Sequence, residues 1–390
     1  MSRASSVTLG WAAFLACSWT WCIGMFLPVL MVRDFGFLGW LVFALPNIIG
    51  AAAMGWVLAR PGAAQKIVAE HAVACQCFSA VTIAFHCFFV SWLVRAMVGL
   101  PGPLLALAIA IALFLLMRRG KLELAVAAGV LVLSLICFAV ALGMRGVPIQ
   151  VFEPAVRQGR QLAYLSPVVV FGFALCPYLD LTFLRARAMT APKAGIAAFT
   201  IGFGCFFLLM ILFTLCYSRW LLPEQIDRLP SALAWVIGIH IIVQAALTVA
   251  LHARPLLAPD AYKPISVAAA VGALAMFCLP LLVGTSKGME SVVAVRGEMV
   301  YRLFMGFYGL AFPAYVWLCM IPLGAANAPT PRQRRVIFAA AVIIAAPMFY
   351  CGFIAGRMIW LLPGLAVMLL ARFVLLIRPR RISAITSQTR

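Results

Sequence analysis

Residues 101–117 read PGPLLALAIAIALFLLM and residues 123–144 read ELAVAAGVLVLSLICFAVALGM, with Arg118, Arg119 and Lys121 between them. Each run is close to the roughly 20 residues that a helix needs to cross the hydrocarbon core of a bilayer. Strands of outer-membrane barrels alternate apolar and polar residues, and these runs are continuously apolar. The stretch therefore predicts two transmembrane helices joined by a short basic loop.

The composition extends this prediction to the whole chain. Of its 390 residues 66% are hydrophobic and only 10% are charged, whereas soluble domains are about 45–50% apolar and about a quarter charged. This excludes a soluble enzyme, a disulfide-stapled secreted domain, a coiled coil and a disordered chain. We expect an all-α polytopic integral membrane protein, embedded in a lipid bilayer, with about 12 transmembrane helices. The predicted helices cover residues 8–31, 37–58, 70–93, 101–117, 123–144, 162–184, 194–218, 231–252, 264–284, 301–323, 336–355 and 358–377.

The loop charges give these helices an orientation. With both termini in the cytoplasm, 19 of the 30 Lys and Arg residues fall on the cytoplasmic side, as the positive-inside rule requires. The net charge of +20 is spread over short loops rather than gathered in a basic domain. It therefore predicts orientation in a bacterial-type inner membrane, with no nucleic-acid partner.

The motifs of soluble and metal-dependent catalysis are absent from the sequence. It contains no HExxH, no Walker GxxxxGK[ST] and no GxSxG with triad partners. The cysteines lie mostly inside apolar runs without a CxxC pair, which is typical of small packing residues. The loops are too short to hold a soluble catalytic domain. We expect no enzyme activity, no metal site and no cofactor.

Two predicted helices carry a glycine followed closely by a proline. Gly24 and Pro28 lie in the first helix, and Gly172 and Pro177 lie in the sixth. Proline removes a backbone donor and glycine lets the backbone leave the helix, so both helices could open. Ordinary proline kinks are the alternative. Helices one and six are equivalent in two inverted five-helix repeats, and transporters bind solute at such interruptions.

Two segments resemble sodium:solute symporters. They are residues 35–47, FGFLGWLVFALPN, and the run from Pro177 through Leu184–Arg187 to Lys193. The resemblance covers about the first 215 residues. It implies the leucine-transporter-type fold: ten core helices in two inverted repeats, with helices 11 and 12 appended. It also implies a substrate site between helices one and six, walled by helices three and eight.

The eighth predicted helix departs from that family. Sodium-coupled members carry neighbouring Ser or Thr hydroxyls there, whereas residues 241–250, IIVQAALTVA, contain one hydroxyl, that of Thr248. Sodium coupling is therefore in doubt, and a proton is the more plausible coupling ion.

The third predicted helix presents a polar stripe: at 100° per residue, its five polar or polarisable residues fall within one quarter of the circumference. They are His71, Cys75, Ser79, Thr82 and His86. The stripe could be interhelical packing or a cavity wall. A metal site is a third reading, but His71 and His86 would lie about 22 Å apart along the helix and could not share one ion.

Ionisable residues at membrane depth are costly and mark functional candidates. We assign His86, His240 and Asp180 as candidate coupling groups, because imidazole titrates near neutral pH. A satisfied buried histidine, or an ion pair for Asp180, is the alternative in each case. Tyr308, at mid-depth in helix ten, is either a packing residue or part of a cavity.

Together these observations predict a secondary transporter of a small neutral or zwitterionic solute, working by alternating access. The alternative is a non-transporting sensor or assembly module with the same fold. The repeats would cover residues 1–160 and 161–325, with two helices and a cytoplasmic tail in 326–390. The expected solute-site residues are Gly24, Pro28, Ser79, Thr82, Gly172, Pro177 and Tyr308.

Overall fold

The computed structural model describes residues 3–118, 120, 122–152, 159–222, 225–283, 290–323 and 329–376. Within these ranges the chain is all-helical and contains no strand. The α-helices are α1 Arg3–Trp19, α2 Cys22–Val57, α3 Ala63–Phe89, α4 Arg95–Val98, α5 Pro101–Met117, α6 Glu123–Arg145, α7 Gly159–Leu175, α8 Leu181–Ala188, α9 Pro192–Ile201, α10 Leu208–Tyr217, α11 Ser231–Leu256, α12 Lys263–Val283, α13 Glu290–Gly306, α14 Phe312–Tyr315, α15 Pro331–Phe353 and α16 Leu361–Leu376. The π- and 3₁₀-helical segments are η1 Val90–Val94, η2 Ile149–Phe152, η3 Cys176–Leu179, η4 Gly202–Phe207, η5 Ile226–Arg228, η6 Phe307–Ala311, η7 Val316–Met320 and η8 Met358–Trp360.

Ten helices in the described part of the chain are long and apolar enough to cross a membrane. The helix Pro101–Met117 is also apolar but has only 17 residues. This indicates a multi-pass membrane protein in contact with a lipid bilayer. The observed bounds of α5 and α6 agree with the predicted bounds to within one residue. Helix α11 extends to Leu256, four residues beyond its predicted end.

The longest helix, α2, has 36 residues, a length of about 54 Å against a hydrocarbon core of about 30 Å. It is interrupted at Gly36, where φ is 63° and ψ is −158°, a conformation that is accessible essentially to glycine alone. Gly36 lies in the gap between the predicted helices 8–31 and 37–58. The single element α2 therefore contains parts of both.

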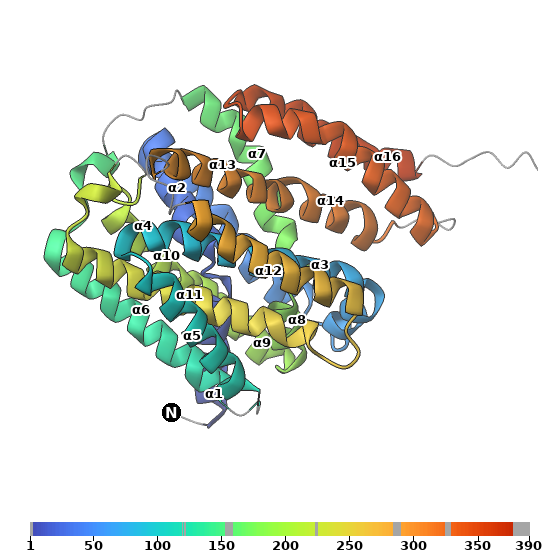
Figure 1. Ribbon diagram of the computed structural model, residues 1–390. Coiled ribbons are helices and arrows are strands. Elements are labelled where there is room, and N and C mark those ends of the chain that lie inside the picture. Colours follow the sequence, from blue (N-terminus) through green and yellow to red (C-terminus); the bar gives the residue numbers. More distant parts are fainter. Residues whose placement is uncertain are drawn as a thin grey trace, which may run out of the picture.

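The helices pack through a central set formed by α1, α2, α3, α7 and α11 (Figure 1). α2 lies against α7, and the two backbones touch: a Cβ added at Gly50 would lie 2.2 Å from the carbonyl oxygen of Phe173. α3 packs against α12, and α11 packs against α5 and α6. α15 and α16 form a hairpin at the periphery that contacts α7 and η7.

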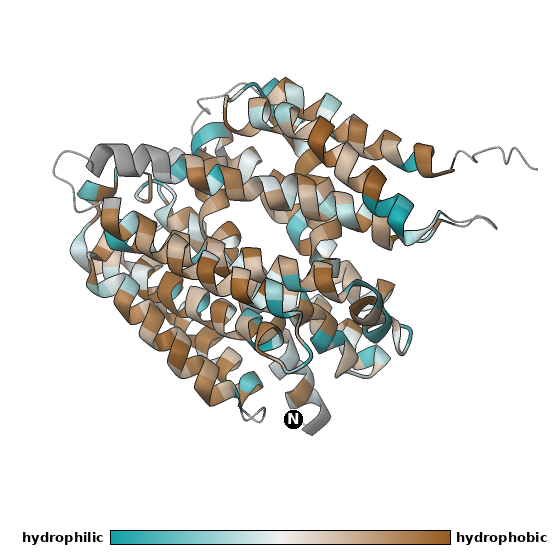
Figure 2. Cartoon of the chain, turned by 45° about the vertical axis from the view of Figure 1, so that its right-hand side comes forward, coloured by the Kyte–Doolittle hydropathy of each residue, from teal (hydrophilic) through white to brown (hydrophobic). Residues whose placement is uncertain are grey.

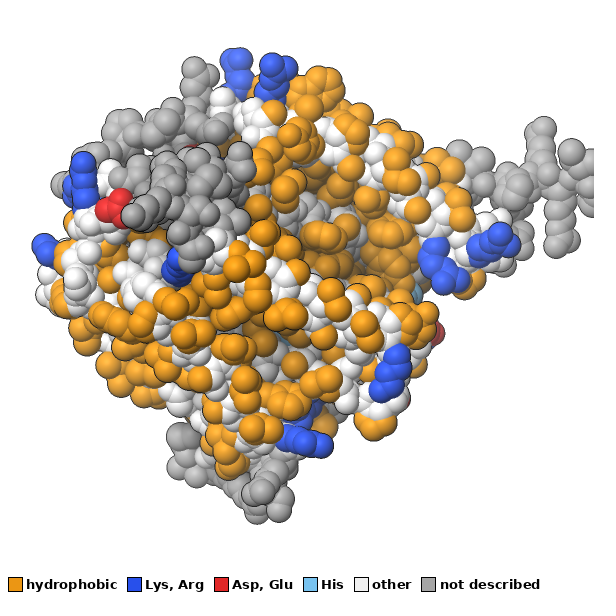
Figure 3. All heavy atoms as spheres, viewed as in Figure 1, with side chains coloured by type: hydrophobic (Ala, Val, Ile, Leu, Met, Phe, Trp, Pro, Cys, Tyr) orange, Lys and Arg blue, Asp and Glu red, His pale blue; other side chains and the backbone are white. Residues whose placement is uncertain are grey.

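The outer surface is predominantly apolar. Hydrophobic residues dominate the helices in Figure 2, and hydrophobic side chains cover most of the face in Figure 3. Helices α5 and α12 expose large aliphatic side chains, among them Leu104, Ile111, Leu115, Val267, Val271 and Leu274. Such a surface is unfavourable in water and suits contact with lipid.

Candidate functional site

The first membrane helix is interrupted at Thr20 and Trp21, between α1 and α2. Neither residue is glycine or proline, and side-chain donors bind carbonyl groups near the end of α1. The Thr20 hydroxyl donates to the carbonyl of Ala16 at 2.9 Å, and the Trp21 indole donates to the carbonyl of Ser18. The carbonyl of Ala16 also accepts from the Thr20 amide at 3.0 Å, and carbonyls at a helix C-terminus otherwise lack intrahelical partners. The side-chain bonds therefore stabilise the interruption.

The prediction that this helix opens at Gly24 and Pro28 is wrong in position. Both residues lie inside α2, which is already regular there, because the Met25 amide donates to the carbonyl of Trp21 at 2.8 Å. Proline removes only one backbone bond, and membrane helices tolerate that loss. Pro28 is buried within α2, and Gly24 lines the cavity described below.

The second interruption separates α7 from α8. It consists of η3, which contains Pro177, and of Asp180 in an extended conformation. The break therefore lies where Pro177 predicted it, since proline cannot donate to the carbonyl four residues earlier. Gly172 has a different role: it lies inside α7, where a Cβ would come within 2.9 Å of the carbonyl oxygen of Tyr308 in η6.

His86 of α3 holds the start of α2. Its Nδ1 lies 2.7 Å from the carbonyl oxygen of Thr82, which can only accept, so Nδ1 carries the hydrogen. Nε2 therefore accepts from the backbone amide of Cys22 at 3.2 Å. Tyr301 donates its hydroxyl to the carbonyl of the same residue at 3.1 Å. These bonds assign His86 to the neutral form and give it a place in the first interruption.

Two tryptophans connect the first interruption to its surroundings. The Trp19 indole donates to the side-chain oxygen of Asn47 at 2.6 Å, joining α1 to the second half of α2. Trp21 packs against rings from three other elements, those of Phe78, His86, His252 and Tyr308. The interruption is therefore in direct contact with α3, α11 and η6.

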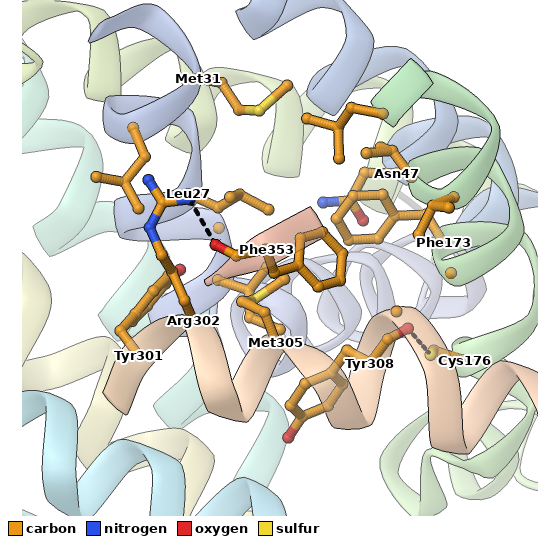
Figure 4. Close-up of a pocket in the computed structure, with 18 of the residues that line it drawn as sticks. Leu27, Met31, Asn47, Phe173, Cys176, Tyr301, Arg302, Met305, Tyr308 and Phe353 are labelled. Carbon is orange, nitrogen blue, oxygen red and sulfur yellow. Dashed lines mark hydrogen bonds between the residues drawn. The ribbon is translucent and has the colours of Figure 1, made fainter. Parts of the chain in front are cut away.

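A cavity of about 80 Å³ extends from the two interruptions along α2. At the interrupted end it is lined by Trp19 and Trp21. Asn47 and Cys176 also line it, and both are labelled in Figure 4. Its walls are mainly apolar and include Leu27, Met31, Phe173 and Met305. About 10–15 Å³ suffices for one water molecule, so the cavity has room for a small solute.

Four charged side chains form a cluster at the far end of this cavity, which Asp34 and Arg302 line. We call them the Arg33 cluster: Arg33, Asp34, Glu298 and Arg302. Arg33 of α2 donates to both carboxylate oxygens of Glu298 of α13 at 2.8 Å. Arg302 lies 2.7 Å from Glu298 and 3.4 Å from Asp34. The side chains are 10–20% exposed, and bidentate Arg–carboxylate pairing is the strong geometry for such contacts. The cluster connects α2 to α13.

A second cavity, of about 620 Å³, lies on the other side of the interruptions. It is lined by Phe14 of α1, by the start of α3, by Thr182 and neighbouring residues of α8, and by the end of α11. Beside it is the Glu123 cluster, in which Glu123 of α6 binds Arg185 of α8 and Arg254 of α11, each at 2.7 Å. The cluster connects three helices.

The predicted polar residues of α3 point into the protein. The Thr82 hydroxyl lies 3.0 Å from that of Tyr308, so Tyr308 lines the cavity without directing its hydroxyl into it (Figure 4). Ser79 lies 3.0 Å from Nδ1 of His252. Both serine and threonine are fully buried. They therefore join α3 to η6 and α11 rather than contact a solute directly.

The coupling candidates are separated in the structure. Asp180 lies at the second interruption, 4.0 Å from Nε2 of His252. His240 lies twelve residues before His252 on α11, about 18 Å along the helix axis, and packs against Phe213. The structure thus brings Asp180 together with a histidine that the sequence reasoning had not selected.

His252 and the pairing of Arg33 with Glu298 of α13 were missed from the sequence. His240, Gln244, Thr248 and His252 follow one another at intervals of four residues, so the i, i+4 series was a usable signal, but the predicted helix ended at residue 252. Glu298 is 265 positions from Arg33, and no local pattern joins them.

No family model, curated protein or solved structure matches this chain. The resemblance to sodium:solute symporters stays a prediction from the residues quoted for it.

Proposed function

We propose that this chain is a secondary active transporter that carries a small solute across an inner membrane by alternating access, coupled to protons. The observation that supports this most strongly is the position of the two cavities on opposite sides of two interrupted helices. A solute bound at the interruptions could reach one cavity or the other, depending on how α1, α2, α7 and α8 are placed. Discontinuous helices at a central site are typical of such transporters.

The helix contacts support the proposed inverted repeats of residues 1–160 and 161–325. In that arrangement α3 corresponds to α11, and α5 corresponds to α12. The contact of α3 with α12 then has its counterpart in the contact of α11 with α5. Likewise, α1 packs on α9 as α7 packs on α2. Ten long apolar helices lie in the described part of the chain. Counting the two halves of α2 as separate spans and adding α5 gives the proposed twelve, of which α15 and α16 are the appended two.

The charged clusters supply two gates in this proposal. The Arg33 cluster closes the end of the first cavity, and the Glu123 cluster holds α8 beside the second. Charged pairs of this kind have two discrete states, made and broken, which alternating access requires. With both termini cytoplasmic, the Glu123 cluster faces the cytoplasm.

The cavity walls favour a small neutral or zwitterionic solute. The cavity volume of about 80 Å³ excludes large ligands, and its polar groups near the interruptions include Asn47 and the backbone around Gly24, Cys176 and Gly172. Thr248 gives the one hydroxyl of residues 241–250, which supports a proton over sodium as the coupling ion.

Uptake into proteoliposomes tests this proposal. We expect at least one member of a panel of labelled amino acids, polyols and small amides to accumulate when the interior is alkaline. A protonophore should abolish that accumulation but preserve solute exchange. Sodium-dependent uptake that is insensitive to pH would contradict proton coupling. Absence of both uptake and exchange across the panel would favour the non-transporting sensor or assembly module.

The orientation can be tested at Arg118, which is exposed at the end of α5; its neighbours Arg119 and Lys121 lie outside the described residues. We expect the cysteine in Arg118→Cys to resist a membrane-impermeant maleimide in intact cells and to react after permeabilisation, because the loop is cytoplasmic. Unmodified protein controls for the native cysteines. Labelling in intact cells would contradict the proposed topology.

A further inference from the structure

Asp180 and His252 face each other inside the protein across the second interruption. The distance from Oδ1 of Asp180 to Nε2 of His252 is 4.0 Å, and both side chains are fully buried. Oδ2 of Asp180 and Nε2 of His252 have no hydrogen-bond partner in the described part of the chain. Buried polar atoms are nearly always paired, because leaving them unpaired costs free energy. These two atoms therefore indicate a bound species that the protein atoms alone do not supply.

The other atoms of the two side chains are already engaged. Oδ1 of Asp180 accepts from the amide and the hydroxyl of Thr182, both at 2.7 Å, so Asp180 caps the start of α8. Nδ1 of His252 lies 3.0 Å from the hydroxyl of Ser79. Two polar atoms therefore remain unpaired among the described residues, Oδ2 of Asp180 and Nε2 of the imidazole beside it.

We propose that Asp180 is the proton-binding group of this protein and that His252 sets its proton affinity. This rests on the proposed proton-coupled transport and names the site that performs it. An aqueous proton forms an O–H bond with Oδ2, which changes the carboxyl group from an anion to a neutral acid. Release breaks that bond and returns the proton to water. The structure assigns the role to this pair rather than to His86, whose two nitrogens are occupied by backbone groups.

The surroundings supply a route for the proton. Leu181 and Thr182, the two residues that follow Asp180, line the second cavity. That cavity is the larger of the two and reaches the Glu123 cluster. A proton that enters this cavity therefore reaches residues that are adjacent to Asp180 in the sequence.

Protonation acts directly on α8. A carboxylate cap stabilises the start of a helix through its bonds to backbone N–H groups and its interaction with the helix dipole, and a neutral acid does so less well. α8 carries Arg185, which binds Glu123 of α6. Loading the proton therefore loosens the helix that the Glu123 cluster fixes, and this couples proton binding to opening of that side.

The other ionisable groups around the pair are few among the described residues. Cys75 and His86 approach the pair from α3 and Tyr308 from η6, and Tyr308 in turn lies near Cys22 of α2 and Cys176 of η3. Arg185 of α8 and Arg254 of α11 belong to the same two helices but bind Glu123. Among these groups, His252 is the histidine whose ring nitrogen lies 4.0 Å from the Asp180 carboxylate.

Infrared difference spectroscopy on the protein in liposomes tests the proposal without any solute. We expect a pH change to produce a carbonyl-stretching band of a buried carboxylic acid, and Asp180→Asn to remove it. Asparagine retains an oxygen that can cap α8, so this variant should fold. Asp180→Glu is the second variant, and it should keep the band at a shifted frequency. A band that survives in Asp180→Asn, or the absence of any such band in the unmodified protein, would overturn the assignment.

His252→Phe tests the pairing. Loss of the imidazole removes the polar group that favours the carboxylate, so we expect the midpoint of the band to rise by about one pH unit. His240→Phe is the matched control: it changes a fully buried histidine of the same helix that packs against Phe213. Equal midpoints in His252→Phe and unmodified protein would overturn the pairing. Failure of solute uptake with an intact, His252-dependent band would instead count against transport alone.

Discussion

Replacing Glu298 by glutamine should open the first cavity and raise the rate at which a cysteine at position 27 reacts with an impermeant thiol reagent about tenfold. Both Arg33 and Arg302 contact Glu298 and Asp34, so neutralising Glu298 leaves two guanidinium groups with Asp34 as their one charged partner in the cluster. Removing one partner of a largely buried ion pair costs about 3–5 kcal/mol. The exposed fractions of 15–20% reduce that figure here, and about 1.4 kcal/mol is enough for a tenfold change in population.

The measurement is the labelling rate of Leu27→Cys in proteoliposomes, followed by mass spectrometry so that native cysteines are distinguished. Glu70→Gln provides the control, because the ion pair of Glu70 with Lys66, 3.8 Å away, lies on an exposed face. Exchange of the two charges, Arg33→Glu with Glu298→Arg, should restore slow labelling in part. Unchanged labelling in Glu298→Gln would show that the cluster does not close the cavity.

Gly50→Ala should be among the most destabilising single-methyl additions in this chain. The new Cβ would lie 2.2 Å from the carbonyl oxygen of Phe173 and 2.8 Å from its carbonyl carbon. These are backbone atoms, so no side-chain rotation relieves the overlap, and α2 must move away from α7. Overpacking of this kind costs about 1–3 kcal/mol or more. We expect the free energy of unfolding, from titration with SDS in mixed micelles, to fall by about 3 kcal/mol.

The matched control is Gly129→Ala on α6, where a Cβ meets nothing within 4 Å. This change should leave the unfolding free energy equal or slightly higher, because alanine favours helix. Equal losses in the two variants would mean that the contact between α2 and α7 is not the tight one that the structure describes.

Much of the helical architecture could be predicted from apolar runs, because in a bilayer every backbone group must be satisfied within the segment. Residues 101–117 and 123–144 became α5 and α6 almost without change. The second interruption was predictable for a local reason, the missing N–H of Pro177. The first was not, because at Thr20 and Trp21 it depends on side chains that bind carbonyls of α1 and on His86, 64 positions away from Cys22.

The candidate site could be predicted only in part, because it too depends on contacts between residues that are far apart in the sequence. Asp180 stood out as an ionisable residue at membrane depth, whereas no histidine was predicted to lie beside it, and His252 was not among the candidates. Which of His86, His240 and His252 meets Asp180 depends on how α11 lies against α8, and helix packing is not encoded in one helix's periodicity. The tight contact of Gly172 with η6 was likewise mistaken for a hinge, since glycine serves both purposes.

Gly36 restricts how the gene for this protein can vary. With φ at 63° and ψ at −158°, its backbone is closed even to asparagine and aspartate, which adopt the left-handed helical region. Every missense change at that codon therefore introduces strain, whatever side chain it adds. Gly62, with φ at 81° and ψ at −10°, lies in that left-handed region and has open space around it, so asparagine should be accepted there. In a saturation library selected for folded protein, codon 36 should return glycine alone, and codon 62 should return a mixture.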